Sequence, residues 1–260
     1  MSNPILDVIA RKGWCVTDGA TGSNFFGRGL EAGYPPELWC LERPEEVLWL
    51  HGEFLKAGAD LILTNSFGSN APRLKLHKSE HRVHEINKAA AQLARQAVSQ
   101  STDDSGYKAV VAGSMGPTGE LFAPMGELTH ESTVAFFTEQ AEALAEGGAD
   151  ALWIETMSSM EEVAAAAEAA KKTGLPVAAT LTFDTTGVMS DMPEKRRTND
   201  SDYQKQYSRF KRRADENLRR QIQLALNYTT ADLFHGNISL RVFESMTLLK
   251  AWIRYLGSKL

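Results

Sequence analysis

The first 187 residues of this 260-residue chain predict an α/β fold, the front part of a (β/α)8 barrel of the TIM type. Short apolar runs alternate with amphipathic, helix-forming stretches, which implies a parallel sheet covered by helices. The apolar runs end in polar, loop-forming clusters, with the sequences DGATG, TNSFG, GSMGPTG, ETMSS and FDTTG. In barrels the chemistry lies at the carboxyl ends of the strands, so these clusters favour a barrel.

Five strands and four helices are expected in this part. The strands are placed at residues 14–17, 60–64, 109–112, 151–154 and 175–183, and the helices at 43–57, 80–99, 129–146 and 159–173. Pro44 suits the first turn of its helix, and the acids that follow it favour the positive end of the helix dipole. Thr129 and Ser132 are both candidate N-caps of the third helix. The sequences between strands and helices are expected to be loops.

An open, doubly wound sheet is the competing fold. Its dinucleotide-binding form carries a GxGxxG fingerprint after the first strand. The first loop here is DGATGS, at residues 18–23, and it lacks that pattern. We therefore prefer the barrel.

Composition and charge limit the class of protein. Hydrophobic residues make up 43% of the chain and charged residues 23%, which is typical of a soluble protein. No apolar run reaches the roughly 20 residues that a membrane helix needs. The short apolar run at the start precedes Arg11 and Lys12, the wrong order for a secretory signal, so we expect a cytoplasmic protein without a membrane partner. Cys15 and Cys40 fit no disulfide framework and are expected to be small buried residues.

Two carboxylates follow apolar strands, Asp18 after the first and Glu155 after the fourth. A pair of acids at the barrel mouth suits a ligand ammonium group, although either acid could instead cap a helix or accept from loop amides. Backbone N–H groups of the loops DGATG and GSMGPTG can bind a carboxylate. The combination predicts a site for an amino acid, with Asn65 as a polar contact and Phe67 as an apolar wall or a core residue.

Three histidines, His77, His81 and His84, have the spacing of one helix face. A metal site there is one interpretation. Lysine and glutamate residues surround them and no cysteine is near, so we expect a solvated helix face instead.

Several of these segments resemble the homocysteine S-methyltransferase family, most of all its bacterial betaine–homocysteine branch. The similar segments, within residues 5–187, are DGATGSNFFGRGL, PPELWCLERPEEV, HGEFLKAGADLILTNSFGSNAPRLKLH, VVAGSMGPTGELFAPMGELTH, EQAEALAEGGADALWIETM and ATLTFDTTG. Five separate strand-end motifs match in order, which makes the resemblance specific.

The resemblance implies a (β/α)8 barrel that binds homocysteine and a zinc ion. Zinc would hold the substrate thiol as a thiolate, which takes a methyl group from a donor such as betaine and gives methionine. By motif position, Asp18 and Glu155 would bind the homocysteine amino group. Gly19 and Ala20 would lie against its backbone portion, and Asn65 and Phe67 would line the site.

The zinc ligands of the family are three cysteines, one in a Gly-x-Asn-Cys segment after the sixth strand and two in a Gly-Gly-Cys-Cys-Gly segment after the eighth. Neither segment occurs in this chain, whose two cysteines lie at its front. Thiolates are the core of such a site, so we expect no catalytic zinc bound in the family's way. A homocysteine- or amino-acid-binding protein without catalysis is the alternative function.

The resemblance ends near Gly187, where the charge also changes. Residues 1–187 hold 14 Lys and Arg against 25 Asp and Glu, a net charge of −11, whereas residues 188–260 hold 14 against 8, a net charge of +6. Such a change indicates a boundary between two domains, 1–187 and 188–260. The second is expected to form two helices, at about 202–227 and 240–256.

Three interpretations of residues 188–260 stay open. They are a frameshift, fusion or mispredicted exon that replaced the rest of the barrel; a genuine helical module, such as a homo-oligomerisation element; and a nucleic-acid-binding segment built on the KRR and RFKRR runs, which no recognised motif supports. Five parallel strands leave two unpaired sheet edges; the alternatives are that the expected helices cover them, or that the chain dimerises or aggregates.

Overall fold

The computed structural model describes residues 3–101 and 108–182. The chain divides into two units, Met1–Asp191 and Met192–Leu260, and every described residue belongs to the first. The helices expected within residues 188–260, and the FDTTG loop that begins at Phe183, lie outside the described residues.

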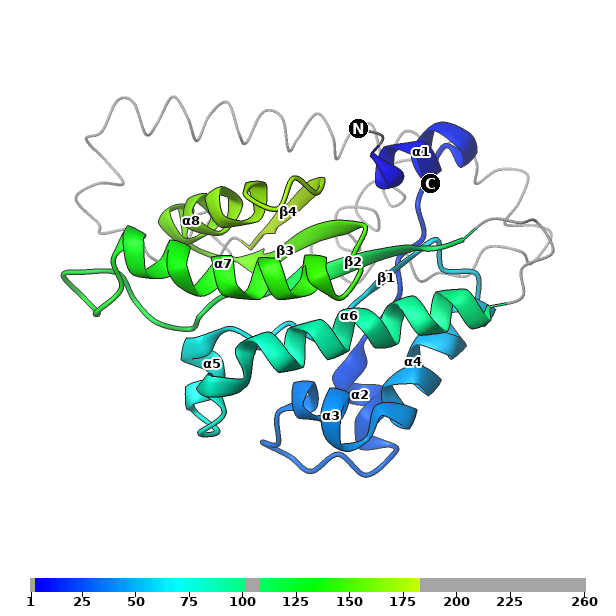
Figure 1. Ribbon diagram of the computed structural model, residues 1–260, viewed down its shortest axis with the longest axis horizontal. Helices are drawn as coiled ribbons and strands as arrows, with labels where there is room; N and C mark the ends of the chain where they lie inside the picture. The colour runs from blue at the N-terminus through cyan, green and yellow to red at the C-terminus, as the bar shows by residue number, and fades with distance from the viewer. Residues whose placement is uncertain (1–2, 102–107, 183–260) are drawn as a thin grey trace, which may run out of the picture. The chain divides into compact units, whose positions relative to one another are not determined.

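Helices and parallel strands alternate along the described chain (Figure 1). In order, the elements are α1 (Pro4–Lys12), α2 (Thr21–Phe26), η1 (Pro36–Leu38), α3 (Trp39–Glu42), α4 (Pro44–Lys56), β1 (Leu61–Leu63), α5 (Ala71–Lys75), η2 (Glu80–Arg82), α6 (Val83–Gln100), β2 (Val110–Met115), α7 (His130–Glu146), β3 (Ala151–Met157), α8 (Met160–Lys171) and β4 (Val177–Leu181).

The four strands form one parallel sheet in the order β1-β2-β3-β4. The α/β class and the parallel sheet are confirmed, but the first expected strand is not formed as a strand. Within residues 14–17 only Thr17 pairs, in an isolated parallel bridge to Leu61. Its neighbour Val16 accepts hydrogen bonds from the amides of Asp60 and Leu61 at 2.7 and 3.1 Å, so this segment lies beside β1 without a ladder of its own.

Three other expectations need correction. The second and third strands of the sheet run further than the apolar runs indicated, through Met115 and Met157, because residues of the following polar clusters still pair with their neighbours. The stretch 80–99 is not one helix: η2 ends at Arg82 and α6 begins at Val83. The DGATG cluster also ends in a helix, since α2 begins at Thr21.

One face of the sheet is covered by helices. Figure 1 shows α6, α7 and α8 along it, and consecutive helices contact one another. Phe137 and Leu144 of α7 are fully buried against Leu152 and Ile154 of β3, and alanines of α8 complete this cluster. Burying such side chains contributes roughly 1.5–3 kcal/mol each, so this face holds the main core.

The opposite face of the sheet is the one that would line the inside of a barrel. Leu61, Val110 and Ala112 are buried there together with Val8 of α1, and Trp153 of β3 packs against them. Since side chains alternate between the two faces of a strand, the residues two positions further along β2 and β3, Ser114 and Glu155, continue this inner face.

Local caps explain several helix ends. Thr129 is the N-cap of α7, and it forms a capping box with Ser132, as the sequence indicated. The chain leaves α4 through Gly58, whose φ of +92° is a conformation that favours glycine. No helix within residues 3–101 and 108–182 combines the length and the apolar character needed to cross a bilayer.

Candidate functional site

Polar side chains gather on the inner face of the sheet, at the carboxyl ends of three neighbouring strands. Ser114 lies in β2, Glu155 in β3 and Thr180 in β4. The Ser114 hydroxyl donates a hydrogen bond to Oε1 of Glu155. Thr180 Oγ1 accepts from the backbone N–H of Thr156 at 3.1 Å. Hydrogen bonds between strands thus support Glu155 and the residue that follows it.

Glu155 occupies an irregular position in its strand. The pairing register of β3 with β4 shifts between Ile154 and Met157, and Thr156 has a φ of +61°. A positive φ is strained for a β-branched residue, and strained positions and bulges cluster at functional sites, where they turn a side chain in a new direction. Glu155 is half-buried, and burial raises the pKa of its carboxyl group, while the Ser114 hydrogen bond acts in the opposite direction.

Asp18 lies beside the carboxyl end of β1. Its backbone N–H donates to Leu61 O at 3.0 Å, and its Oδ2 accepts from the Leu63 N–H at 2.8 Å. One carboxylate oxygen of Asp18 therefore accepts a hydrogen bond from a backbone amide. This is the alternative role, acceptance from backbone amides, that the sequence left open for this residue. The sheet order places β1 and β2 between Asp18 and Glu155, so the two carboxylates do not lie on neighbouring strands.

Gly19 and Ala20 follow Asp18 directly. Gly19 packs on the ring of Phe54, since a Cβ built there would lie 3.2 Å from Phe54 Cε1. Ala20 is exposed and is the N-cap residue of α2. The two residues therefore connect the bridge at Thr17 to a helix rather than forming an open loop.

Asn65 and Phe67 lie in the segment after β1. The Asn65 side chain is 5% exposed, and its Nδ2 donates to Pro36 O at 2.7 Å, so its amide nitrogen is directed toward η1. Phe67 is half-buried and its ring lies on Gly116, where a Cβ would come within 2.6 Å of the ring. Phe67 thus retains an exposed surface at the ends of the strands, whereas Asn65 is held in the interior.

A buried network that the sequence analysis did not identify joins the ends of β1 and β2. The hydroxyls of Thr64 and Ser66 are 2.6 Å apart, Thr64 Oγ1 accepts from Ser114 N at 2.9 Å, and Ser66 Oγ donates to Ser114 O at 2.8 Å. Gln140 of α7 donates to Ser66 O at 2.9 Å. The sequence signal that could have indicated this network is the hydroxyl residues Thr64, Ser66 and Ser114 at the ends of the two apolar runs. The network fixes Ser114, the partner of Glu155.

The described residues do not fit a zinc site. They contain no group of three or more His, Cys, Asp and Glu side chains that could hold a metal ion. Cys15 lies near Asp60, at the amino end of β1, and burial raises the pKa of its thiol to about 11. Burial also raises the pKa of the Cys40 thiol, which donates to Asn65 O at 3.4 Å. A cysteine binds zinc as its thiolate, and burial disfavours that form in both residues, so neither cysteine suits a zinc site.

The three histidines do not share one helix. His77 follows α5, His81 lies in η2 and His84 in α6, and all three are exposed. His84 Nε2 is 2.8 Å from Oε2 of Glu146 on α7. This agrees with the expected solvated surface.

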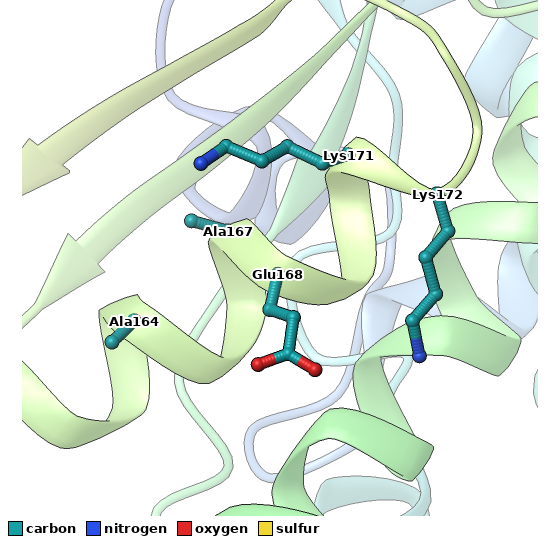
Figure 2. A pocket seen from close by; sticks show the side chains of 5 residues that line it. All are labelled: Ala164, Ala167, Glu168, Lys171 and Lys172. Carbon is teal, nitrogen blue, oxygen red and sulfur yellow. The ribbon is translucent and has the colours of Figure 1, made fainter.

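A hollow in the surface lies along α8, lined by Ala164, Ala167, Glu168, Lys171 and Lys172 (Figure 2). The Glu168 carboxylate contacts His130 at 2.9 Å, and Lys172 Nζ donates to Thr138 Oγ1 at 3.2 Å. These groups tie α8 to α7 in the helix layer. The candidate site lies on the other face of the sheet.

Comparison with known proteins identifies the family of this chain. The model of the family described as homocysteine S-methyltransferase matches residues 15–202. The methionine synthase of Mycobacterium tuberculosis is 30% identical over 199 residues, and that of Mycobacterium leprae 29%. In both cases 71% of this chain aligns with 16% of the relative, so the chain spans about a sixth of their length.

Solved structures show the same fold. The metallated form of the homocysteine methyltransferase MmuM from Escherichia coli has a TM-score of 0.62 and 25% identity, covering 75% of this chain and 72% of that one. The oxidized form of the same enzyme has a TM-score of 0.61 and 24% identity, with 74% and 70% covered. The chain therefore shares its fold with that enzyme.

Proposed function

This chain belongs to the homocysteine S-methyltransferase family, and from that premise we propose that its described part binds homocysteine at the carboxyl ends of the strands. We propose further that the four-stranded sheet and the bridge at Thr17 are the first part of an eight-stranded barrel. Asp18, Gly19, Ala20, Asn65, Phe67 and Glu155 are the residues assigned to the substrate.

The observation that carries the proposal is the supported carboxylate of Glu155. Ser114 is the one hydrogen-bond donor that the described residues supply to it, so the carboxylate retains acceptor capacity for a ligand. A half-buried acid with a raised pKa is stabilised as an anion by a cation at close range, and an ammonium group has both the charge and three donors. Asp18 supplies a second carboxylate on the inner face, beside β1 rather than in β3.

Phe67 provides an apolar surface suited to the substrate's methylene groups. The backbone amides of Gly68 and Gly116 already donate to Glu37 and Phe67 O, so those of Gly19 and Ala20 are the candidates for the substrate's carboxylate group. Each feature matches one part of a zwitterionic amino acid with a short aliphatic side chain.

We assign to this chain the binding of homocysteine rather than the complete methyl transfer. The zinc that the family resemblance implies would hold the thiol as a thiolate, but the only two cysteines of the 260 residues do not fit its ligand positions. Transfer from betaine or a similar donor therefore requires ligands that these residues do not contain.

The test is a calorimetric titration of the full chain with homocysteine, in the wild type and in Glu155→Gln, Asp18→Asn and Glu168→Gln. Glu168 is a carboxylate on the helix layer and serves as the matched control. Loss of a hydrogen bond to a charged group is worth roughly 1.5–3 kcal/mol, so Glu155→Gln should weaken binding about 10- to 100-fold. Absence of binding heat at millimolar homocysteine would refute the proposal. Turnover with betaine and added zinc would contradict the restriction to binding.

A further inference from the structure

The segment after β1, residues 65–68, is held from two sides. On the β2 side, the Gly116 N–H donates to Phe67 O at 3.0 Å. On the η1 side, the Gly68 N–H donates to Oε1 of Glu37 at 2.7 Å. The position of Phe67 between these two contacts therefore depends on Glu37 as well as on the sheet.

Glu37 is an unusual residue to find in this place. Its side chain is 6% exposed, in a short 3-10 helix, and burial raises the pKa of its carboxyl group. Burying a carboxyl group is costly unless a hydrogen bond compensates, and an apolar side chain would fill the same space at lower cost. The carboxyl group is therefore explained by its hydrogen bonds rather than by the packing of the core.

The shape of residue 68 matches this contact. A Cβ at Gly68 would lie 2.8 Å from Glu37 Oε1 and 3.3 Å from its Cδ, so the carboxyl group rests directly on the Cα of this residue. Arg73 and His77 act on Glu37 electrostatically, but among the described residues neither forms a salt bridge with it. The carboxyl group also accepts from the backbone N–H of Glu37 itself, so the hydrogen bond from Gly68 is the one that connects it to the segment after β1.

We propose that Glu37 is a positioning residue: by holding the Gly68 N–H, it fixes Phe67 as a wall of the substrate site. The part of this proposal that concerns homocysteine rests on the proposed function. The part that concerns the segment 65–68 does not, and it is measured separately.

The experiment uses the full chain as wild type, Glu37→Gln and Glu37→Met. Glutamine keeps an acceptor at the same place, whereas methionine has a similar length and leaves the Gly68 N–H unsatisfied. Hydrogen–deuterium exchange of the peptide covering residues 65–70 should become at least fivefold faster in Glu37→Met, since a buried unsatisfied donor is worth roughly 1–3 kcal/mol. Glu37→Gln should restore slow exchange. Homocysteine affinity should fall by a similar factor in Glu37→Met and recover in Glu37→Gln.

Val98→Ala is the control for general destabilisation, because Val98 is buried in α6 against Ile62 and Ala94, in a core cluster that contains neither Glu37 nor residues 65–68. It should lower the melting temperature without selectively accelerating the exchange of residues 65–70. Equal exchange of this peptide in the wild type and Glu37→Met overturns the proposal, as does fast exchange in Glu37→Gln. Fast exchange in Glu37→Met with unchanged homocysteine affinity would refute the claim that the position of Phe67 affects substrate binding. If the wild type binds no homocysteine while exchange responds as expected, the proposed function fails and the positioning of the segment stands.

Discussion

Acidification should destabilise this protein through His51. This residue lies in α4, its side chain is 2% exposed, and neither ring nitrogen has a hydrogen-bond partner among the described residues. Burial lowers the pKa of the imidazole from 6.5 to about 4 in the folded protein. The unfolded chain, in which the ring is solvated, therefore takes up the proton first as the pH falls.

The magnitude follows from these two values. Above pH 6.5 the ring is neutral in both states and the free energy of unfolding does not depend on it. Below that pH the free energy of unfolding falls, and it levels off near pH 4 after a total loss of about 3 kcal/mol. At pH 5 the loss is about 2 kcal/mol, which is a large fraction of the stability of a typical domain.

The assay is urea unfolding at pH 7.5 and pH 5 for the wild type and His51→Leu. Leucine has a similar volume and no nitrogen, so the variant should lose about 2 kcal/mol less than the wild type between these pH values. The carboxyl groups of Glu37 and Glu155, whose pKa values burial raises, change stability in the opposite direction, but equally in both proteins. His81→Leu, at an exposed histidine, should keep the wild-type dependence. Identical pH dependence in the wild type and His51→Leu would refute this account.

Four further substitutions test the packing and the site. Gly113→Ala places a Cβ 2.9 Å from Leu152 Cδ2 and 3.0 Å from Leu144 Cδ1, so it should destabilise the protein by about 1–3 kcal/mol in urea unfolding. A Cβ at Gly52 has nothing within 4 Å, so Gly52→Ala should stabilise α4 by roughly 0.5–1 kcal/mol. Equal effects of the two substitutions would argue against the packing described for β2. Thr129→Ala removes the cap of α7 and should lower the melting temperature through a loss of about 1 kcal/mol, and an unchanged value would show that the capping box is not formed in solution. Gly116→Ala brings a Cβ within 2.6 Å of the Phe67 ring and should displace it, weakening homocysteine binding at least tenfold in calorimetry; unchanged affinity would exclude Phe67 from the site.

Sequence reasoning worked best where the signal was local. The helix that begins at Pro44, the cap at Thr129 and the parallel α/β class all follow from residues close together in the chain. It failed at the first strand, because an apolar run predicts burial beside β1 but cannot tell a single bridge from a ladder. It also ended β3 too early, because Met157 pairs with Leu181 of β4 after the irregularity at Glu155 and Thr156.

The alternation of strands and helices, the family and the candidate residues at the strand ends were all accessible from the sequence alone, because each depends on periodicity or on a motif of consecutive residues. The direction of each side chain depended on the tertiary structure. The amide of Asn65 is directed toward Pro36, the carboxylate of Glu155 is held by Ser114, and Glu37 supports Gly68 across 31 positions of the chain. Such pairs cannot be predicted from a sequence pattern, since hydrogen bonds between distant residues form only once the strands and helices have been brought together.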